Sequence, residues 1–328
     1  MTNYKPFIMQ GAFFAVFISK IVILLKLLCD KMKNKNEVFT MTLKEINIRD
    51  PFVLPYKDTY YMYGTRAKTC WGLADGFDCY TSKDLVNWDG PFEVFHKPEN
   101  FWADKNYWAP EVHIYNNTFY MFATFNSEAL DKKGTMILSS ESPLGPFKVH
   151  SNGKITPDEW NSLDGTFYLS PEGKPYMIFS HEWVDLADGE ICSVELSDDL
   201  TRPVSEPVTL FKASQAKPWV KGMKHRLRNE ICYVTDGPFM HRLDNGELIM
   251  LWASISEGGY AEAIARSDNG NIDGNWTIDE KPLFDKDGGH GMLFRTFKGE
   301  LMMVLHQPNE TPKEHPVFIP INEDSLAR

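Results

Sequence analysis

The chain has 328 residues, of which 43% are hydrophobic, and its formal net charge is −11 at pH 7. This composition is that of an ordinary globular protein with enough apolar residues for a large core. The acidic balance, without any Lys/Arg-rich patch interleaved with aromatic residues, argues against nucleic-acid binding and favours a neutral ligand.

The first forty residues differ in composition from the rest of the chain. Residues 7–29 form a strongly apolar run that contains two lysines and is followed by three more between residues 31 and 35. About 20 apolar residues can span a bilayer, so this run could contact or cross a membrane. The lysines that follow it would then hold the remaining chain on the cytoplasmic side. Export is the least favoured interpretation, because a secretory signal has the opposite charge asymmetry and a small-residue cleavage site.

A second interpretation is that translation starts at Met41, since the patterned part of the chain begins directly after it. Both interpretations divide the chain in the same way. We predict an apolar segment over residues 1–40 and one folded domain over residues 41–328.

After Met41 the chain repeats one pattern five times: a polar residue, an apolar run, a turn and a second apolar run. The turns are Lys57-Asp58, Asn116-Asn117, Glu172-Gly173, Asn245-Gly246 and Lys298-Gly299. Turns of this kind between apolar runs predict β-hairpins. A hairpin that returns every 50 to 70 residues, with room for two further strands, is typical of a propeller blade. The sequence therefore predicts an all-β, five-bladed β-propeller that follows the short apolar segment.

The polar residue that opens each hairpin is the candidate for function. These residues are separated by 61, 53, 72 and 54 positions, and they are Asp50, Glu111, Asp164, Asp236 and His290. The innermost strands of all blades converge on the propeller axis, so we expect the five side chains to share one end of a central funnel. Like charges crowded there are unfavourable unless pairing, protonation or an ion relieves them. The alternative is that acids before hairpins simply cap loops.

The carboxyl-terminal run from His315 to Ile321 has no hairpin partner of its own. We expect it to complete the last blade together with residues 41–46, which would fasten the two ends of the ring. The five cysteines are odd in number and lack CxxC spacing. Cys70 and Cys79 share a loop and could pair, although reduced thiols are the commoner case.

Five short motifs, taken together and in order, resemble glycoside hydrolase family 43. They are Arg49-Asp50-Pro51, Trp108-Ala109-Pro110-Glu111-Val112, Leu163-Asp164-Gly165, Asp236-Gly237-Pro238 and Gly289-His290-Gly291. The resemblance extends from about Leu43 to Ile321. It implies a five-bladed β-propeller and an inverting hydrolase that acts on arabinosyl, xylosyl or galactosyl linkages of an oligosaccharide or polysaccharide-derived substrate.

The resemblance also implies roles for single residues. Asp50 matches the general base, and Asp164 matches the acid that orients its partner and modulates its pKa. Asp236 stands where the family usually has a glutamate as general acid. Inverting hydrolysis needs a base and an acid roughly 6.5 to 9.5 Å apart, with a water molecule between them. Aspartate retracts the carboxyl group by roughly 1.5 Å. We expect a shift of backbone or substrate to compensate, so that Asp236 still donates the proton; the alternative donors are Glu111, Glu182 and Glu190.

Further residues are candidates for holding the sugar. Trp71 and Trp108 could act as stacking platforms, although Trp108 could equally pack between blades. Glu111, His181, Glu182 and Glu190 could contact sugar hydroxyls, and the plainer interpretation of the last three is a satisfied surface turn.

The resemblance implies no required cofactor, but it matches His290 to an axial histidine that often reaches a calcium ion or its waters. Calcium prefers six to eight oxygen ligands, and no Asp-rich calcium loop is visible. Any such structural calcium ion would be held mainly by water.

Two other functions remain open from the sequence. One is a glycan-binding propeller that has lost catalysis. The other is a related glycoside phosphorylase, which should place clustered cations at the funnel to bind phosphate. The cations expected near the mouth are Arg49, Arg66, Lys68 and Arg295.

Overall fold

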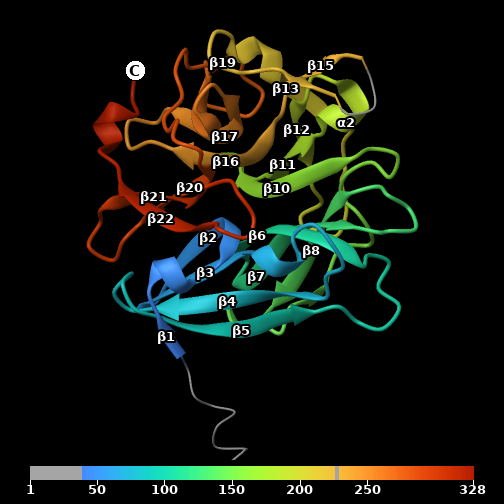
Figure 1. The fold of residues 1–328 in the computed structure, drawn as a ribbon, viewed down its shortest axis with the longest axis vertical. Coiled ribbons are helices and arrows are strands. Elements are labelled where there is room, and N and C mark those ends of the chain that lie inside the picture. The colour runs from blue at the N-terminus through green and yellow to red at the C-terminus, as the bar shows by residue number, and fades with distance from the viewer. Residues whose placement is uncertain (1–38, 226–228) are drawn as a thin grey trace, which may run out of the picture. The chain divides into compact units, whose positions relative to one another are not determined.

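The computed structural model describes residues 39–225 and 229–328. Their strands form five antiparallel sheets around a common centre, and the first strand of each predicted hairpin lies innermost (Figure 1). This arrangement confirms the predicted all-β, five-bladed β-propeller. The blades follow one another along the chain, so each predicted hairpin supplies the two inner strands of one blade.

Blade one contains β2 (Ile48–Tyr56), β3 (Thr59–Arg66), β4 (Gly76–Ser82) and β5 (Trp88–His96). Blade two contains β6 (Lys105–Tyr115), β7 (Thr118–Asn126), β8 (Gly134–Ser140) and β9 (Lys148–Val149). Blade three contains β10 (Ser162–Leu169), β11 (Pro175–His181), β12 (Glu190–Glu195) and β13 (Val208–Lys212). A short helix, α2 (Trp183–Leu186), follows β11.

Blade four contains β16 (Asp236–Arg242), β17 (Leu248–Ser256), β18 (Gly259–Ser267) and β19 (Trp276–Ile278). Blade five contains β20 (Gly289–Arg295), β21 (Leu301–Gln307) and β22 (His315–Pro320). A separate two-stranded sheet pairs β14 (Met223–Lys224) with β15 (Ile231–Cys232).

Every innermost strand carries a β-bulge at the same place. In blade one, Arg49 pairs with Thr65 and Phe52 pairs with Tyr63, so two residues lie outside the register. The first residue of each bulge has a φ angle between 47° and 58°; these five bulge residues are Asp50, Ala109, Asp164, Gly237 and His290. Bulges bend a strand and re-aim its side chains. Here they bring equivalent positions of five blades to the axis.

The bulges correct the alignment of two blades. Glu111 is not the second blade's equivalent of Asp50, because the bulge residue there is Ala109 and Glu111 already pairs with Phe122 on β7. Asp236 lies one position before the bulge residue Gly237. Asp236 is therefore equivalent to Arg49 rather than to Asp50.

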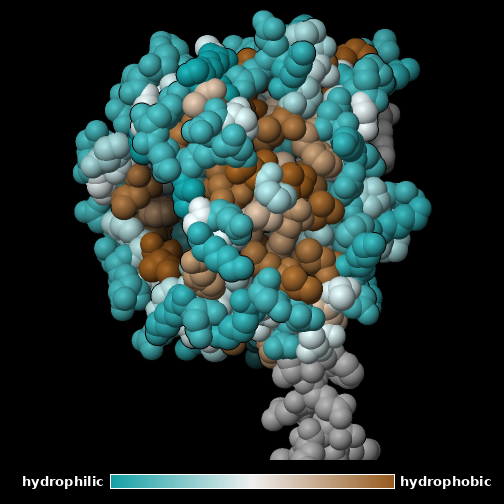
Figure 2. Space-filling view, turned by 90° about the vertical axis from the view of Figure 1, so that its left-hand side faces the viewer, coloured by the Kyte–Doolittle hydropathy of each residue, from teal (hydrophilic) through white to brown (hydrophobic). Residues whose placement is uncertain are grey.

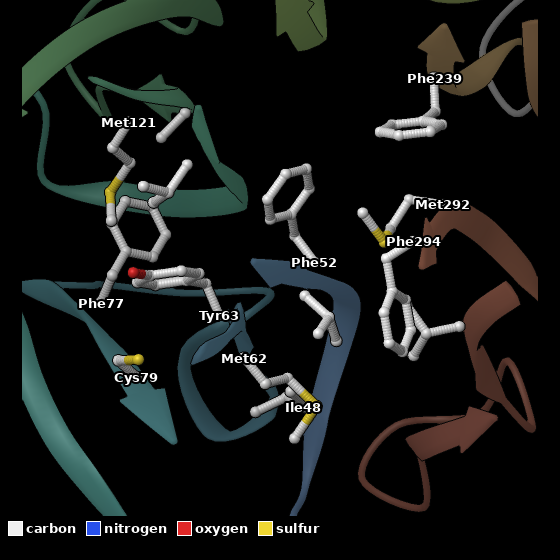
Figure 3. Close-up of a cluster of buried hydrophobic side chains, with 14 of the residues drawn as sticks. Ile48, Phe52, Met62, Tyr63, Phe77, Cys79, Met121, Phe239, Met292 and Phe294 are labelled. Carbon is white, nitrogen blue, oxygen red and sulfur yellow. The ribbon is translucent and has the colours of Figure 1, made fainter. Parts of the chain in front are cut away.

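Large apolar side chains fill the axis along the inner strands beyond the bulges. Phe52 of β2 is 5% exposed, and its ring centroid lies 6.3 Å from that of Phe239 on β16. Figure 3 shows Phe52, Phe239 and Met292 directed towards one another from three different blades. This packing holds the inner strands at fixed distances, which in turn fixes the bulge residues.

The ring closes differently from the prediction. β22 pairs with β21 and completes blade five, as expected. However, β1 (Phe39–Met41) joins the outer edge of blade one beside β5, and the 3-10 helix Leu43–Glu45 contacts β22. The residues around Met41 therefore extend blade one rather than blade five.

Blade five has three strands among the described residues, so β22 forms its outer edge. Val317, Phe318 and Ile319 of this strand remain half-buried. Figure 2 faces the side on which β21 and β22 lie in Figure 1, and it shows hydrophobic residues gathered in the middle of a hydrophilic rim. The short blade leaves part of its apolar packing at the surface.

Cys70, Cys79 and Cys192 are buried and free, so the Cys70–Cys79 pairing is not formed. No helix in residues 39–225 or 229–328 has the length and apolar character needed to cross a bilayer. The apolar run at residues 7–29 lies outside the described part of the chain.

We expect a protein that begins at Met41 to fold and to be as active as the full chain. Residues 41–328 form one compact unit, and the truncation removes only two residues of β1, which leaves β2 to β5 in place. Circular dichroism should give a Tm within roughly 4 °C of the full chain, the shift that about 1 kcal/mol causes in a large domain. An insoluble Met41 protein beside a well-behaved full chain would contradict this expectation.

Candidate active site

A cavity of about 550 Å³ opens at the end of the funnel where the bulges lie. Its volume is in the range of small-molecule binding sites. The bulge residues and the residues just before them supply much of its lining: Arg49, Asp50, Trp108, Leu163, Asp164, Asp236 and His290. The fold thus brings the three predicted carboxylates and the predicted histidine into one site.

Asp50 is held in place through both its backbone and its carboxylate. Its N–H donates to Nδ1 of His306 at 3.2 Å, and its Oδ2 accepts a hydrogen bond from Oγ1 of Thr65 at 2.6 Å. Its Oδ1 lies 3.3 Å from Nδ1 of His290. Burial would raise the pKa of Asp50, but His290 and the Arg49 guanidinium outweigh it and lower the pKa. Asp50 is therefore suited to remain a carboxylate.

Asp164 and Asp236 have the opposite electrostatic character. Burial raises the pKa of Asp164 well above its ordinary value, and the negative charges of Asp236 and Asp50 raise it further. Burial and then the charge of Glu182 raise the pKa of Asp236 to about 7. A proton is therefore available on this pair near neutral pH, which is the property that a general acid requires.

Two hydrogen bonds fix the positions of this pair. The N–H of Gly237 donates to Oδ2 of Asp164 at 3.0 Å, and the Tyr260 hydroxyl donates to Oδ2 of Asp236 at 3.1 Å. Asp164 also donates its own N–H to Oγ1 of Thr124 at 2.8 Å. The backbone of the residue next to Asp236 is thus bonded directly to Asp164, so the two carboxyl groups are positioned as a unit.

His290 lies between two carboxylates, with Nδ1 at 3.3 Å from Asp50 and 3.7 Å from Asp164. Position 237 must be glycine, because a Cβ there would lie 2.7 Å from the His290 ring and φ is 50°. In residues 39–225 and 229–328, no group of three or more His, Cys, Asp or Glu side chains could hold a metal ion. His290, Asp50 and Asp164 therefore do not form a dedicated calcium site, and the predicted calcium ion stays a prediction.

Glu182 is the second candidate acid in the cavity. It is 8% exposed and pairs with Nζ of Lys133 at 2.6 Å. Burial raises the pKa of Glu182, and Lys133 offsets part of that increase. The Lys133 ammonium also lies 5.5 Å from the Trp108 ring centroid. Glu182 thus stands next to the predicted sugar platform.

Three predicted sugar-binding residues do not line the cavity. Glu111 is buried beyond the bulge of β6, and its Oε2 lies 2.9 Å from Nε2 of His113. His181 stacks on Trp160 with ring centroids 3.8 Å apart. Glu190 forms an ion pair with Lys212 at 2.8 Å on the outer strands of blade three.

The two predicted platforms both line the cavity. Their rings meet edge to face with centroids 5.5 Å apart. Trp71 is 64% exposed, the Arg49 guanidinium lies 5.2 Å from its ring, and its Nε1 donates to Oγ1 of Thr311 at 2.9 Å. Trp108 donates its Nε1 to the Cys70 carbonyl at 2.6 Å. Trp71 therefore presents an open and oriented aromatic face to a ligand.

Of the four cations expected at the mouth, Arg49 lines the cavity and the other three do not. Arg66 pairs with Asp78, and Arg295 pairs with Asp244. Their charges are thus committed to ion pairs on the blades.

Sequence reasoning missed several residues that support the carboxylates. Thr65, Tyr260 and His306 contact Asp50 or Asp236, and Asn309 lines the cavity. They lie on second strands, a third strand and a loop, where no local motif marks them. Only the pairing of strands within each blade, and the packing of the blades around the axis, bring them to the site.

We expect Asp236→Asn to stabilise the protein above pH 7. The pKa of Asp236 is raised to about 7 in the folded protein from an ordinary value of 3.8. The folded state then binds more protons than the unfolded state between these values, so stability falls as pH rises through this window. Asparagine removes the whole penalty, which is on the order of 2–4 kcal/mol. Thermal unfolding should show a Tm gain of several degrees at pH 8 and little gain at pH 4. An equal gain at both would contradict the raised pKa.

The chain is similar to a known family and to solved structures over most of its length. The model of the family "Glycosyl hydrolases family 43" matches residues 40–321. The solved structure of an endo-arabinase from Bacteroides thetaiotaomicron VPI-5482 is 41% identical, with a TM-score of 0.79 over 87% of this chain and 98% of that chain. An endo-1,4-beta-xylanase from the same organism is 24% identical and has the same fold, with a TM-score of 0.66 over 87% of this chain and 97% of that chain.

A relative with a curated description is the extracellular endo-alpha-(1->5)-L-arabinanase 1 of Bacillus subtilis (strain 168). It is 23% identical over 149 residues, which are 42% of this chain and 44% of that protein. The match therefore spans less than half the length of that relative. The family match, by contrast, covers all five blades, and the chain belongs to glycosyl hydrolases family 43.

Proposed function

We propose that this protein hydrolyses the α-1,5-linked arabinosyl bonds of arabinan by an inverting mechanism. The observation that carries the proposal is a single cavity in which Asp50 has a lowered pKa and Asp236 a raised one. Two carboxyl groups with opposite pKa shifts suit a base and an acid. The choice of arabinan rests on the arabinan-acting enzymes named among the relatives, one of them 41% identical over most of both chains.

The reaction follows from these two protonation states. The Asp50 carboxylate removes a proton from a water molecule, whose oxygen attacks the anomeric carbon. Asp236 gives its proton to the glycosidic oxygen as the bond to the anomeric carbon breaks. The product has the opposite anomeric configuration, and exchange of protons with solvent resets both groups. Asp164 accepts the N–H of Gly237, the residue beside Asp236, and so positions the acid. Burial and the charge of Glu182 keep Asp236 protonated.

The cavity has little that would hold phosphate. Arg49 is the only lysine or arginine among its described lining residues, and it already pairs with Glu314 at 2.7 Å. A phosphorylase needs a cluster of free cationic donors. Water is therefore the better acceptor of the glycosyl group in this site.

A substrate panel tests the proposal. The full chain would be incubated with linear α-1,5-arabinan, xylan and galactan, and with aryl arabinofuranoside, xyloside and galactofuranoside, with and without inorganic phosphate. We expect release of reducing ends from arabinan at a rate that does not depend on phosphate. Preference for xylan or galactan would overturn the substrate assignment, and turnover only with phosphate would overturn hydrolysis.

A further inference from the structure

The N–H groups of the bulge residues are bonded from one blade to the next. Thr65, opposite Arg49 on β3, accepts the N–H of Ala109 at 2.7 Å. Thr124, opposite Trp108 on β7, accepts the N–H of Asp164 at 2.8 Å. In both cases the acceptor lies on the second strand of a blade and the donor is the bulge residue of the following blade.

In blade five, the equivalent position on the second strand is occupied by a histidine. His306 lies on the second strand opposite Gly289, so it is equivalent to Thr65 and Thr124. Its Nδ1 accepts the N–H of Asp50 at 3.2 Å, which closes the ring between the last blade and the first. The acceptor beneath the candidate base is therefore an imidazole rather than a hydroxyl.

Both ring nitrogens of His306 have polar neighbours. Arg49 can only donate, and its Nη2 lies 2.8 Å from the side chain of Asn309, so the atom of Asn309 that it meets is the oxygen. Nε2 of His306 lies 3.4 Å from that same oxygen, and Nδ1 faces both the N–H of Asp50 at 3.2 Å and its Oδ1 at 3.4 Å. A ring protonated at Nε2 donates to Asn309 and accepts the N–H of Asp50. Nδ1 then carries a lone pair directed at the N–H of Asp50. Burial lowers the pKa of His306 to about 3, which keeps the ring neutral.

The backbone N–H of Asp50 needs an acceptor of this kind. Its φ angle of 52° lies in the left-handed region, which is unfavourable for residues other than glycine. Its N–H is buried, so without a partner it would favour a different backbone conformation. Tyr260 stacks on His306 with ring centroids 5.6 Å apart. The Tyr260 hydroxyl also donates to Asp236, so His306 packs against the residue that holds the candidate acid.

We propose that His306 is a positioning residue that holds the catalytic base Asp50 in its strained conformation by accepting its backbone N–H. This inference rests on the role of Asp50 in the proposed function. Loss of the acceptor should let the bulge relax and move the carboxylate away from the attacking water. A displacement near 1 Å can cost on the order of 100-fold in rate.

The test compares His306→Ala with His306→Asn in the full chain. Asparagine places an oxygen where Nδ1 lies and can still accept the N–H. We expect His306→Ala to lower kcat on the best substrate of the panel by about 100-fold with KM within about threefold. His306→Asn should stay within about tenfold of the wild-type kcat. Tyr63→Phe is the control, because it removes another buried bond between blades, from the Tyr63 hydroxyl to the Pro143 carbonyl at 2.6 Å. Neither of these two residues lines the cavity. The control variant should lower Tm and leave kcat unchanged.

An unchanged kcat in a folded His306→Ala protein would overturn the proposal. If that variant does not fold, His306→Asn decides: a kcat within about tenfold of wild type supports the role of the acceptor, and a loss as large as that expected for alanine overturns it. A crystal structure of the folded alanine variant separates this inference from the proposed function. Relaxation of Asp50 out of the left-handed region supports the positioning role even if no glycoside is hydrolysed, and an undisturbed Asp50 contradicts it.

Discussion

Asp50→Asn should reduce kcat by at least 100-fold on every substrate, with KM little changed. The amide cannot take a proton from water, and loss of general base catalysis typically costs 10²-fold or more. The substitution is nearly isosteric, and the amide oxygen can still accept the hydrogen bond that Thr65 now gives to Oδ2. Binding of sugar through the aromatic platforms should therefore survive, and the loss should lie in the chemical step. Steady-state kinetics together with calorimetric binding of an oligosaccharide would measure both parts.

Asp279→Asn is a matched control for this variant. Asp279 pairs with Arg266 at 2.8 Å on blade four and does not line the cavity. Its loss should lower stability and leave kcat near the wild-type value. An Asp50→Asn protein that kept more than about a tenth of the wild-type kcat would remove Asp50 from the role of base.

Asp236→Ala should slow substrates with poor leaving groups by about 100-fold to 10,000-fold, the usual contribution of a general acid. Activated aryl glycosides should lose far less, because their leaving groups scarcely need a proton. Asp236 is the residue in the cavity whose pKa of about 7 fits this role. Its carboxyl group lacks one carbon relative to glutamate, and the Tyr260 hydroxyl at 3.1 Å fixes where it lies. Comparison of kcat/KM on arabinan fragments and on aryl arabinofuranosides would show the contrast.

Glu182→Gln separates the two candidate acids. If Asp236 donates the proton, this variant should cleave both substrate classes with a similar, modest loss. The basic limb of its pH profile should move to lower pH, because the charge of Glu182 helps to raise the pKa of Asp236. A leaving-group dependence in Glu182→Gln, and none in Asp236→Ala, would assign proton donation to Glu182. Equal loss on both classes in Asp236→Ala would give Asp236 a structural role.

The fold was predictable because each repeat contains a turn whose residues favour a β-hairpin. Turns such as Asn245-Gly246 have a strong hairpin preference, and five of them at similar spacing leave few other architectures. Closure of the ring was less predictable. The short strand Phe39–Met41 pairs through its backbone with β5, and apolar side chains alone do not show which blade it joins.

The candidate site was predictable at the bulge residues with ionisable side chains, namely Asp50, Asp164 and His290. The second blade was misaligned by two residues because Glu111 has the expected chemistry while Ala109 has the expected backbone. A usable signal was present: proline or glycine follows the bulge residue in every blade, at Pro51, Pro110, Gly165, Pro238 and Gly291. Aligning the blades on that residue gives the register that the structure has.

The supporting residues could not be found in this way. Tyr260 and His306 reach Asp236 and Asp50 across strand and blade boundaries, and their partners are 24 and 256 residues away in the chain. Glu182 and Glu190 lie in the same stretch of blade three, yet only Glu182 lines the cavity. That difference depends on the path of the backbone between β11 and α2, which the pattern of apolar residues in the sequence does not predict.

The anomeric configuration of the first product tests the central claim most directly. Proton NMR would follow the full chain as it cleaves an α-1,5-linked arabino-oligosaccharide, before mutarotation mixes the anomers. A base and an acid that act on opposite sides of the sugar predict that the β-anomer appears first, and that Asp50→Asn abolishes its formation. Initial release of the α-anomer would contradict direct attack by water and the assignment of Asp50 as its base.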